Sequence, residues 1–332
     1  MANIREVAAA AGVAKATVSR VVNGSARVSD PTRRRVEEAI RALDYRPSAI
    51  ARGLSRGRTM TVGVIAPFFT HPSAVEKLRG AEDRFTERGY DIVLYNVGRP
   101  EQVQEQFQNV ADGRPNGVLV FSLAPPKREL NRLLDAGVPI VLEDVRHPAL
   151  TNVYIDNVEG GYLATRHLIE IGHRRIAFVG DPSDNPYGFT SSADRCRGFR
   201  RAMAEFGLEV PQAYVKEGPH GRQIAHRLTS ELLHLNEPPT AVVAASDTQA
   251  LGVLEVANAL AVDSPRRLSV VGFDDIEVAA YVGLTTIRNP LFQSGARAAE
   301  LLLEASSDRQ MAPVAEQMPI ELIVRKSTSP PR

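Results

Sequence analysis

The sequence predicts a small all-α unit at the N-terminus, followed by a large α/β domain made of two lobes with parallel sheets. Three observations indicate this division. The first 45 residues carry only short helical patterns separated by glycine and proline. From Met60 onward, short β-branched runs alternate with helical stretches. Charge is divided in the same way, because residues 1–59 hold 12 Lys and Arg against 5 Asp and Glu, whereas the remainder holds 28 against 34.

Length and composition set the class of protein. A chain of 332 residues exceeds one ordinary domain, and 43% hydrophobic with 24% charged residues is typical of a globular protein. No apolar run reaches the roughly 18 residues of a membrane span, and the start does not resemble an export signal. The single cysteine, Cys196, cannot form an internal disulfide. We therefore expect a cytoplasmic protein with no membrane partner.

Two short helices are predicted first. Residues Ile4 to Ala11 place Ile4, Val7, Ala8 and Ala11 on one face, and Gly12 then supplies a tight turn. Residues Lys15 to Val22 form the second helix, which Asn23-Gly24 breaks. Val18, Val21 and Val22 are its apolar positions.

A third helix follows, with Asp30 as its cap and Pro31 at its first position. We expect it to turn Val36, Ile40 and Leu43 inward and to end near Tyr45. After Pro47, Ser48 can cap a very short helix with the sequence AIARGL. Gly53 within it costs roughly 1 kcal/mol relative to alanine, and so short a helix orders only against a partner.

The remainder of the chain predicts parallel sheets covered on both faces, because nearly continuous apolar strands alternate with helices. There are too many strands for one short sheet, and the stretch Thr151–Asp156 lies near the middle. Two similar lobes are therefore expected, with a ligand in the crevice where strand ends meet. The end of the chain, STSPPR, is predicted to fray. The predicted strands are TVGVIA, DIVLY, GVLVF, PIVL, RIAFVG, TAVVAA and LSVVGF.

The strongest functional motif is AGVAKATVSRVVNG, residues 11–24. It is typical of a helix-turn-helix, whose second helix presents its N-terminal end to base edges in the major groove of DNA. Arg20 is suited to a bidentate pair with guanine, and Ala16 to an apolar contact such as a thymine methyl. The alternative is a helical hairpin with a merely solvated polar face. The predicted DNA contacts of this helix are Lys15, Ala16, Thr17, Ser19, Arg20 and Asn23, of which Thr17, Ser19 and Asn23 are of the type that holds phosphates.

At these motifs the chain resembles the LacI/GalR family of bacterial repressors nearly from end to end. The headpiece segments IREVAAAAGVAKATVSRVVNG and VSDPTRRRVEEAIRALDYRPSAIARGL precede TVGVIAP in that family's usual order. Further on, GHRRIAFVG, RCRGF, ASDTQALG, LSVVGFDD and LTTIRNP are similar to its sensor-domain motifs. The resemblance implies a periplasmic-binding-protein-like sensor, an operator-binding homodimer associated with the nucleoid, and a small-molecule effector.

The resemblance also implies a hinge helix whose leucine wedges into the minor groove at a central CG step. That residue is Leu54, with Ala51 beside it and Arg52 facing phosphates; such a wedge costs a few kcal/mol. The alternative is a plain linker. Relatives commonly have Ser where Ala14 stands, and alanine forfeits a helix cap of about 1 kcal/mol, which leaves the preferred half-site open.

For the effector, the resemblance points to the arginine before the GF pair and the aspartate after the next GF, which are Arg195 and Asp274. Asp247 is a third candidate, although relatives often have Asn-Asp where this chain has Ser246-Asp247. A guanidinium and carboxylates suit sugar hydroxyls. Phe69 and Phe292 are candidate apolar walls. The alternatives are a structural capping role for Asp274 and core packing for the two phenylalanines.

The stretch 181–195 is rich in turn-forming residues and is predicted to form a loop near the mouth of the crevice. Its side chains Tyr187, Phe189 and Asp194 either reach the ligand or only close the loop.

The expected domains are a headpiece over residues 1–46, a hinge and linker over 47–59, and a sensor and dimerisation domain over 60–327. The N-lobe would comprise about 60–158 and 291–317, and the C-lobe about 159–290 and 318–327. We predict a dimer, because the chain lacks the leucine-heptad tail of the family's tetramers.

The expected function is a DNA-binding regulator, most simply a repressor, with no cofactor beyond a small effector, for which a carbohydrate is the leading class. The alternative is the same class of regulator with a nucleoside or other metabolite as its corepressor. A solute-binding receptor is the alternative from a different class; the missing export signal and residues 1–59 argue against it. No GxSxG, Walker, HExxH or GxGxxG motif is present, so neither an enzyme nor a metal site is expected.

Overall fold

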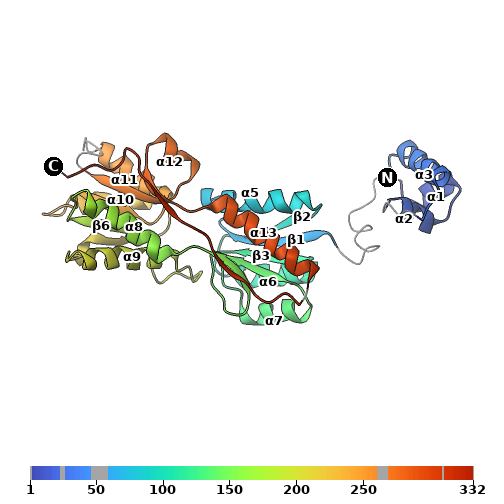
Figure 1. Cartoon of the computed structure of the whole chain (residues 1–332), viewed down its shortest axis with the longest axis horizontal. Helices are drawn as coiled ribbons and strands as arrows, with labels where there is room; N and C mark the ends of the chain where they lie inside the picture. Colours follow the sequence, from blue (N-terminus) through green and yellow to red (C-terminus); the bar gives the residue numbers. More distant parts are fainter. Residues whose placement is uncertain (1, 23–26, 46–58, 260–267, 309, 332) are drawn as a thin grey trace.

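The computed structural model describes residues 2–22, 27–45, 59–259, 268–308 and 310–331, and Figure 1 shows a helical unit near the N-terminus and two α/β lobes. The three helices are α1 (Ile4–Ala11), α2 (Lys15–Val22) and α3 (Asp30–Ala42), as expected in order and type. The short helix predicted at AIARGL lies outside the described residues. Among those described, no helix is long and apolar enough to span a membrane.

Local chemistry explains where the first helices begin and end. Asn3 caps α1, since its side chain accepts from the amides of Arg5 and Glu6 while the Glu6 carboxylate accepts from the Asn3 amide. Gly12, at φ 63°, ends the helix. Val7, Val18 and Val36 are fully buried and form the centre of the small core.

Two details of α3 differ from the prediction. Ser29 is the N-cap position, and Asp30 and Pro31 are the first two helical residues. The helix ends at Ala42, and Asp44 adopts φ 43°, which lets the Tyr45 amide donate to the Ile40 carbonyl. The chain therefore turns Tyr45 into the core, whereas Leu43, predicted to face inward, is exposed.

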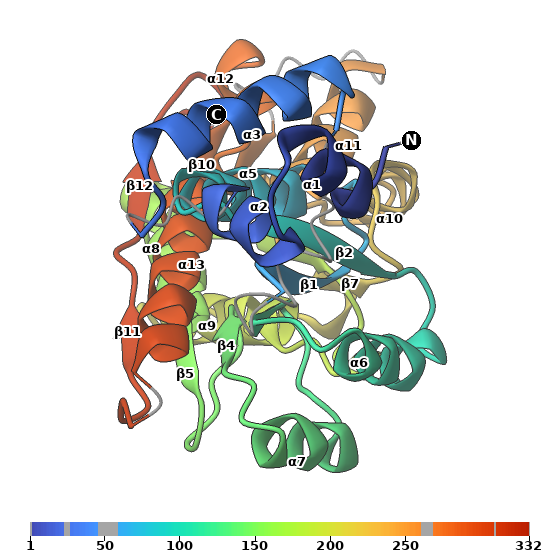
Figure 2. The same cartoon turned by 90° about the vertical axis from the view of Figure 1, so that its right-hand side faces the viewer.

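The N-lobe sheet has the strand order β11-β5-β4-β3-β1-β2, and all of its pairs are parallel. Neighbouring residues of a strand enter different cores, as Val64 and Ile65 of β1 do. Helices α5 and α13 pack on one face, and α6 and α7 lie on the other (Figure 1 and Figure 2). The elements are β1 (Thr61–Pro67), α5 (Pro72–Glu87), β2 (Asp91–Val97), α6 (Gln102–Gly113), β3 (Gly117–Phe121), α7 (Lys127–Asp135), β4 (Ile140–Glu143), β5 (Thr151–Tyr154), α13 (Leu291–Ser307) and β11 (Ala315–Gln317).

The C-lobe sheet repeats this plan with the order β12-β10-β9-β8-β6-β7, and only the β10–β12 pair is antiparallel. Helices α8 and α9 pack on one face, and α10 and α11 pack on the other. The elements are α8 (Asn157–Glu170), β6 (Ile176–Gly180), α9 (Ser191–Glu205), a 3₁₀ turn (Gln212–Tyr214), β7 (Val215–Glu217), α10 (Arg222–Leu233), β8 (Ala241–Ala244), α11 (Asp247–Ala259), β9 (Ser269–Asp274), α12 (Glu277–Tyr281), β10 (Thr285–Arg288) and β12 (Glu321–Ile323).

Each lobe contains a close helix pair that depends on glycine. A Cβ at Gly80 of α5 would overlap the Phe292 carbonyl of α13, and a Cβ at Gly295 would overlap the Lys77 carbonyl. In the C-lobe, Gly161 of α8 lies against the Arg195 carbonyl in the same way. Gly198 of α9 likewise lies against the Val158 carbonyl. In both lobes the backbones touch directly, which fixes the depth of the residues beside the glycines.

The C-terminal tail is ordered, contrary to the prediction that it frays. The Ser327 hydroxyl donates to the Val270 carbonyl at 2.7 Å and accepts from the Thr285 amide at 2.8 Å. The Ser329 carbonyl lies 3.0 Å from both His173 Nε2 and Ser269 Oγ. Turn-forming composition suggested disorder, but these buried polar partners hold the tail on the C-lobe.

Deleting residues 327–332 removes these partners and leaves buried polar groups of β9 and β10 unsatisfied. Each such group costs about 1–3 kcal/mol, so we expect the free energy of unfolding to fall by about 3 kcal/mol. Urea denaturation followed by circular dichroism measures it. Deletion of residues 331–332 alone is the control and should change little. Equal stability of the two truncations would contradict the prediction.

Candidate functional site

Strained residues mark the carboxyl ends of the strands. Phe68 follows β1, Ser122 follows β3 and Asp144 follows β4; these three residues have φ of 45°, 54° and 62°. Asp274 ends β9 at φ 110°, and Asp275 has φ 55°. Positive φ is costly for residues other than glycine and clusters at functional sites. Both lobes thus place strained polar or aromatic residues where parallel α/β sheets bind ligands.

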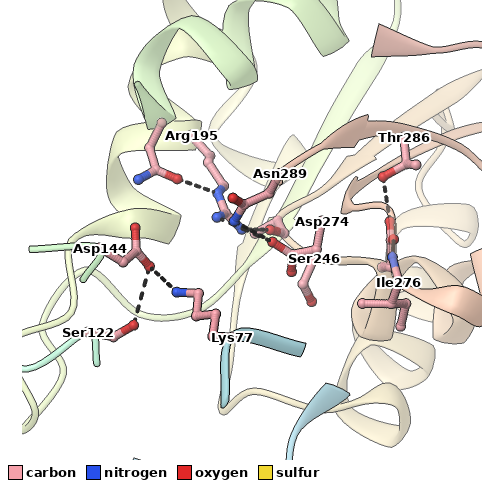
Figure 3. Close-up of polar contacts among 12 residues, drawn as sticks. Lys77, Ser122, Asp144, Arg195, Ser246, Asp274, Ile276, Thr286 and Asn289 are labelled. Atoms are coloured by element: carbon pink, nitrogen blue, oxygen red, sulfur yellow. Dashed lines mark hydrogen bonds and ion pairs between the residues drawn. The ribbon is translucent and has the colours of Figure 1, made fainter. Parts of the chain in front are cut away.

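Arg195 is buried in the C-lobe and makes several polar contacts. It comes from α9 and is 7% exposed. Its Nε donates to Asn157 Oδ1 at 2.8 Å, and its Nη1 donates to the Ala245 carbonyl at 2.5 Å (Figure 3). The guanidinium carbon also lies 3.5 Å from the centre of the Phe273 ring. These contacts fix the position of the guanidinium.

Asp274 is the acidic partner of this arginine. One of its oxygens lies 3.7 Å from Arg195 Nη2 and 3.4 Å from Asn289 Nδ2. Burial raises the pKa of Asp274, and the cations Arg195 and Lys77 oppose that rise. The sequence prediction that Arg195 and Asp274 lie together therefore agrees with their observed positions.

The N-lobe contributes a second charged cluster that sequence reasoning missed. Lys77 of α5 is 4% exposed, and its Nζ lies 2.7 Å from Glu143 and 3.3 Å from Asp144. The Ser122 hydroxyl approaches Asp144 at 3.3 Å, and Ser294 of α13 donates to Glu143 at 2.7 Å. The cluster therefore joins the ends of β3 and β4 to the α5–α13 pair.

Burial and charge act in opposite directions on the pKa values of this cluster. Burial alone would lower the pKa of Lys77, but the carboxylates of Asp144 and Glu143 raise it above its ordinary value. Burial raises the pKa of Glu143 to about 7, against the effect of the Lys77 ammonium. The pKa of Asp144 is lowered despite its burial, because Lys77 and Arg195 favour the carboxylate. Lys77 and Asp144 are therefore charged at neutral pH.

Aromatic and imidazole rings connect the lobes beside these charges. Phe68 and His71 stack at 5.0 Å between ring centres, and His71 stacks on His220 of the C-lobe at 5.2 Å. The Phe68 ring also meets Tyr187 edge-on at 5.1 Å. Asp181 lies 3.2 Å from His220 Nδ1, and burial, which would lower the His220 pKa, is outweighed by this carboxylate, which raises it.

The loop predicted at 181–195 is shorter than expected, since α9 begins at Ser191 and includes Asp194. Tyr187 and Phe189 pack against the N-lobe core, and the Tyr187 hydroxyl donates to the Gly98 carbonyl at 3.0 Å. Asp194 pairs with Arg197 on its own helix. The two aromatic rings therefore hold the loop across the lobes.

The other three predicted effector residues do not join the Arg195 cluster. Asp247 is fully buried, and its oxygens accept from the Ile276 amide at 2.9 Å and the Thr286 hydroxyl at 2.6 Å. Burial raises its pKa to about 8. These contacts position the backbone after Asp274, which is a structural role. Phe69 is 36% exposed, whereas Phe292 lines a surface pocket of about 380 Å³ with Arg79 and Arg288, on the side of Asn289.

The predicted DNA-reading face of α2 is at the surface. Val18 and Val21 are buried, whereas Lys15, Ala16 and Arg20 are exposed and Thr17 and Ser19 are partly exposed. The Ala14 carbonyl begins the helix by accepting from the Thr17 amide at 2.8 Å. The remaining predicted DNA contacts, Asn23, Ala51, Arg52 and Leu54, lie outside the described residues.

The signal for the missed residues is weak in the sequence. Lys77 occupies a helix position that reads as a surface charge, and Phe68, His71 and Asp144 follow strands with no motif of their own. His220 is isolated in the sequence. Only the rule that ligands bind beyond strand ends would have pointed to them. Among the described residues, no group of three or more His, Cys, Asp or Glu side chains is arranged to hold a metal ion.

Comparison with known proteins agrees with both parts of this structure. Residues 3–48 match the family model described as bacterial regulatory proteins, lacI family, and residues 165–328 match that of a periplasmic binding protein-like domain. The chain is 34% identical to the HTH-type transcriptional repressor PurR of Vibrio cholerae, over 98% of this chain and 97% of that protein.

Several solved structures are similar over nearly the whole chain, including the following two. One is a complex of the transcriptional regulator CelR with cellobiose, with 32% identity, a TM-score of 0.73, and coverage of 98% of this chain and 100% of that one. The other is the lac repressor dimer bound to operator and an anti-inducer, with 25% identity, a TM-score of 0.87 and 99% coverage of both chains.

Proposed function

The chain belongs to the LacI family of bacterial regulatory proteins, and from this premise we propose that its effector is a sugar or a similar polyhydroxylated molecule bound between the lobes. As a member of that family it is a DNA-binding regulator of transcription and not an enzyme. Arg195 and Asp274 bind this effector, and its binding alters the affinity of the chain for the operator.

The pairing of the buried Arg195 of α9 with Asp274 at the end of β9 carries this proposal. Arg195 offers fixed donors, and Asp274 beside it offers acceptors. A hydroxyl both accepts from a guanidinium and donates to a carboxylate, so adjacent hydroxyls satisfy this pair without unpaired charge. The aromatic residues Phe68 and Tyr187 nearby suit the apolar face of a sugar ring. The CelR neighbour is a complex with cellobiose, which supports the same class.

The headpiece and the sensor are coupled through the lobes in this proposal. Two chains place two copies of α2 on one palindromic operator, and the Leu54 segments order on the DNA between them. The effector alters the closure of the lobes and thereby the ordering of those segments. Such coupling is about 1–3 kcal/mol and is reciprocal between effector and DNA.

A ligand panel tests the class of effector. Thermal unfolding is followed with monosaccharides, disaccharides, nucleosides and purine bases, one at a time. A ligand at about 100 times its dissociation constant adds roughly 2.7 kcal/mol to the free energy of unfolding. We expect sugars to raise the melting temperature. Stabilisation by nucleosides or purines with none by sugars would refute the sugar assignment and leave the regulator assignment intact.

Operator binding gives a further prediction. Replacing Arg20, which is exposed on α2, with alanine should cost about 1–3 kcal/mol on the preferred palindrome, because we expect this arginine to pair with guanine. Fluorescence anisotropy against a palindrome library with a central CG step, at two salt concentrations, measures it. The variant should retain its weak binding to random DNA.

The control for this assay is Arg132→Ala, which removes an exposed arginine of the N-lobe. It should bind the palindrome as the unchanged chain does. Leu54→Ala, tested beside it, should weaken binding if that residue enters the minor groove. Equal affinity of the Arg20 variant for the palindrome would show that another residue reads the sequence.

A further inference from the structure

The chain leaves β9 through two consecutive residues with positive φ. Asp274 has φ 110° and Asp275 has φ 55°, and α12 then begins at Glu277. The value at Asp274 lies outside the small left-handed region that residues other than glycine usually adopt. Such a conformation costs free energy and persists only where the surrounding structure determines it. Neighbouring contacts must therefore hold this backbone.

The carboxylate of Asp275 is held by two guanidinium groups. Its Oδ2 accepts from Arg288 Nε at 2.9 Å, and its Oδ1 accepts from Arg325 Nη2 at 2.6 Å. The side chain of Asp275 is only 9% exposed, so both ion pairs are largely removed from water. Arg325 also donates to the Leu284 carbonyl at 2.7 Å. The carboxylate thus ties the turn after β9 to β10 and to the segment that follows β12.

The two acids have different partners, although one peptide bond joins them. Arg288, the last residue of β10, pairs with Asp275, and the next residue, Asn289, donates through Nδ2 to Asp274 at 3.4 Å. Asp274 also lies 3.7 Å from Arg195, and Figure 3 shows these side chains together. The partners of Asp274 therefore belong to the effector site, whereas those of Asp275 hold the backbone behind it.

We propose that Asp275 is a positioning residue of the effector site. Its two ion pairs hold the strained backbone that directs Asp274 toward Arg195. When the carboxylate of Asp275 is released, the strained turn relaxes and the neighbouring peptide moves with it. Asp275 thus acts through Asp274. The role of Asp274 toward an effector rests on the proposed function, whereas the coupling of Asp275 to Arg195 does not.

A double-variant cycle between Asp275 and Arg195 tests the proposal without a ligand. In the unchanged chain, Arg195→Met leaves the Asp274 carboxylate buried and unpaired. In the Asp275→Gly variant, glycine accepts positive φ, and the released turn lets that carboxylate move toward water. Urea denaturation of the single variants and the double variant measures the free energy of unfolding. We expect the double variant to lose less stability than the sum of the two single changes, although substitutions without shared partners usually add.

Arg325→Met separates positioning from direct attraction between charges. It removes a cation, whereas Asp275→Gly removes an acid, so direct electrostatic coupling to Arg195 would have opposite signs in the two cycles. Release of the turn gives the same sign in both cycles, which is the result we expect. Glu277→Gly is the matched control, because it removes an exposed acid and adds backbone freedom two residues further on. Its effect should add to that of Arg195→Met.

Effector affinity gives a second readout. Cellobiose, ribose and adenosine are each titrated by calorimetry against the full chain, and the one that binds most tightly is the probe. Asp275→Gly should weaken binding of the probe about tenfold, which is a typical coupling between neighbouring groups. In the Asp274→Asn variant, the same change should weaken it by less than about twofold, because Asp275 acts through Asp274. A purely structural role would weaken binding equally in both backgrounds.

Additive effects of Asp275→Gly and Arg195→Met would overturn the proposal, and so would cycles of opposite sign for Asp275→Gly and Arg325→Met. Where Arg195→Met does not fold, Arg195→Lys takes its place, since an ammonium cannot replace the forked contacts of a guanidinium. Binding of adenosine with none of either sugar would refute the sugar assignment alone. If none of the three probes binds, the urea cycles still decide whether Asp275 positions Asp274.

Discussion

Replacing Arg195 with methionine is expected to weaken effector binding by roughly 100-fold and to destabilise the folded chain. The guanidinium is buried and donates to Asn157 and Ala245, and it lies beside Asp274. Methionine fills similar space but offers no donor. Truncating one partner of a buried charge pair costs about 2–5 kcal/mol, because the other charge stays buried and unpaired.

Calorimetric titration with the sugar found in the ligand panel measures the first effect, and urea denaturation measures the second. The loss of stability should shrink as the pH is lowered from 7 to 5. Asp274 already has a raised pKa from burial, and without Arg195 that pKa rises further. The folded variant then binds a proton that the unfolded chain binds only at lower pH, so its stability increases as the pH falls.

Arg197→Met is the matched control for this prediction. Arg197 lies on the same helix two residues later, with a side chain 68% exposed and paired with Asp194 at the surface. Exposed ion pairs contribute about 0–1 kcal/mol, so this variant should bind effector normally. If both variants bound effector equally well, the ligand would not contact Arg195, and the site would have to be sought elsewhere in the cleft.

Much of the fold follows from local signals in the sequence. Helices α1 and α2 and strand β3 have the predicted bounds; Asn3 and Gly12 delimit α1, and an unbroken apolar run defines the buried strand β3. Strands β7, β10, β11 and β12 were not among the predicted strands. Strands β7, β11 and β12 have three residues each, none of them buried, and are defined by their partner strands rather than by their own patterns. Strand β10 is largely buried, but its sequence TTIR has only one aliphatic residue.

The site was predictable in part for a related physical reason. Arg195 and Asp274 stand beside GF pairs that resemble family motifs, so their sequence context revealed them. Lys77 had no such context, since a lysine on a helix is ordinarily solvated, and only packing shows that this one is 4% exposed. Asp247 had a motif, but its two hydrogen bonds show that the fold itself uses its carboxylate.

Replacing Gly161 with alanine is expected to lower the free energy of unfolding by about 2–3 kcal/mol, although alanine is the better helix former by about 1 kcal/mol. The new methyl group would overlap the Arg195 carbonyl, so α8 and α9 must separate. That movement displaces Arg195 from Asn157, which lies on α8, and from Ala245 after β8. Effector binding should therefore weaken with the stability.

Gly113→Ala, at the end of α6, is the control that separates the effect of helix propensity on stability from the effect of helix packing. A Cβ there meets only the Tyr95 hydroxyl, at 3.0 Å, which is the tip of a flexible side chain. We expect this control to be neutral or more stable by about 0.4–1 kcal/mol, with normal effector binding. Urea denaturation and calorimetric titration compare the two. If Gly161→Ala also gained stability, the α8–α9 pair would tolerate separation, and the position of Arg195 would not depend on glycine contact between these helices.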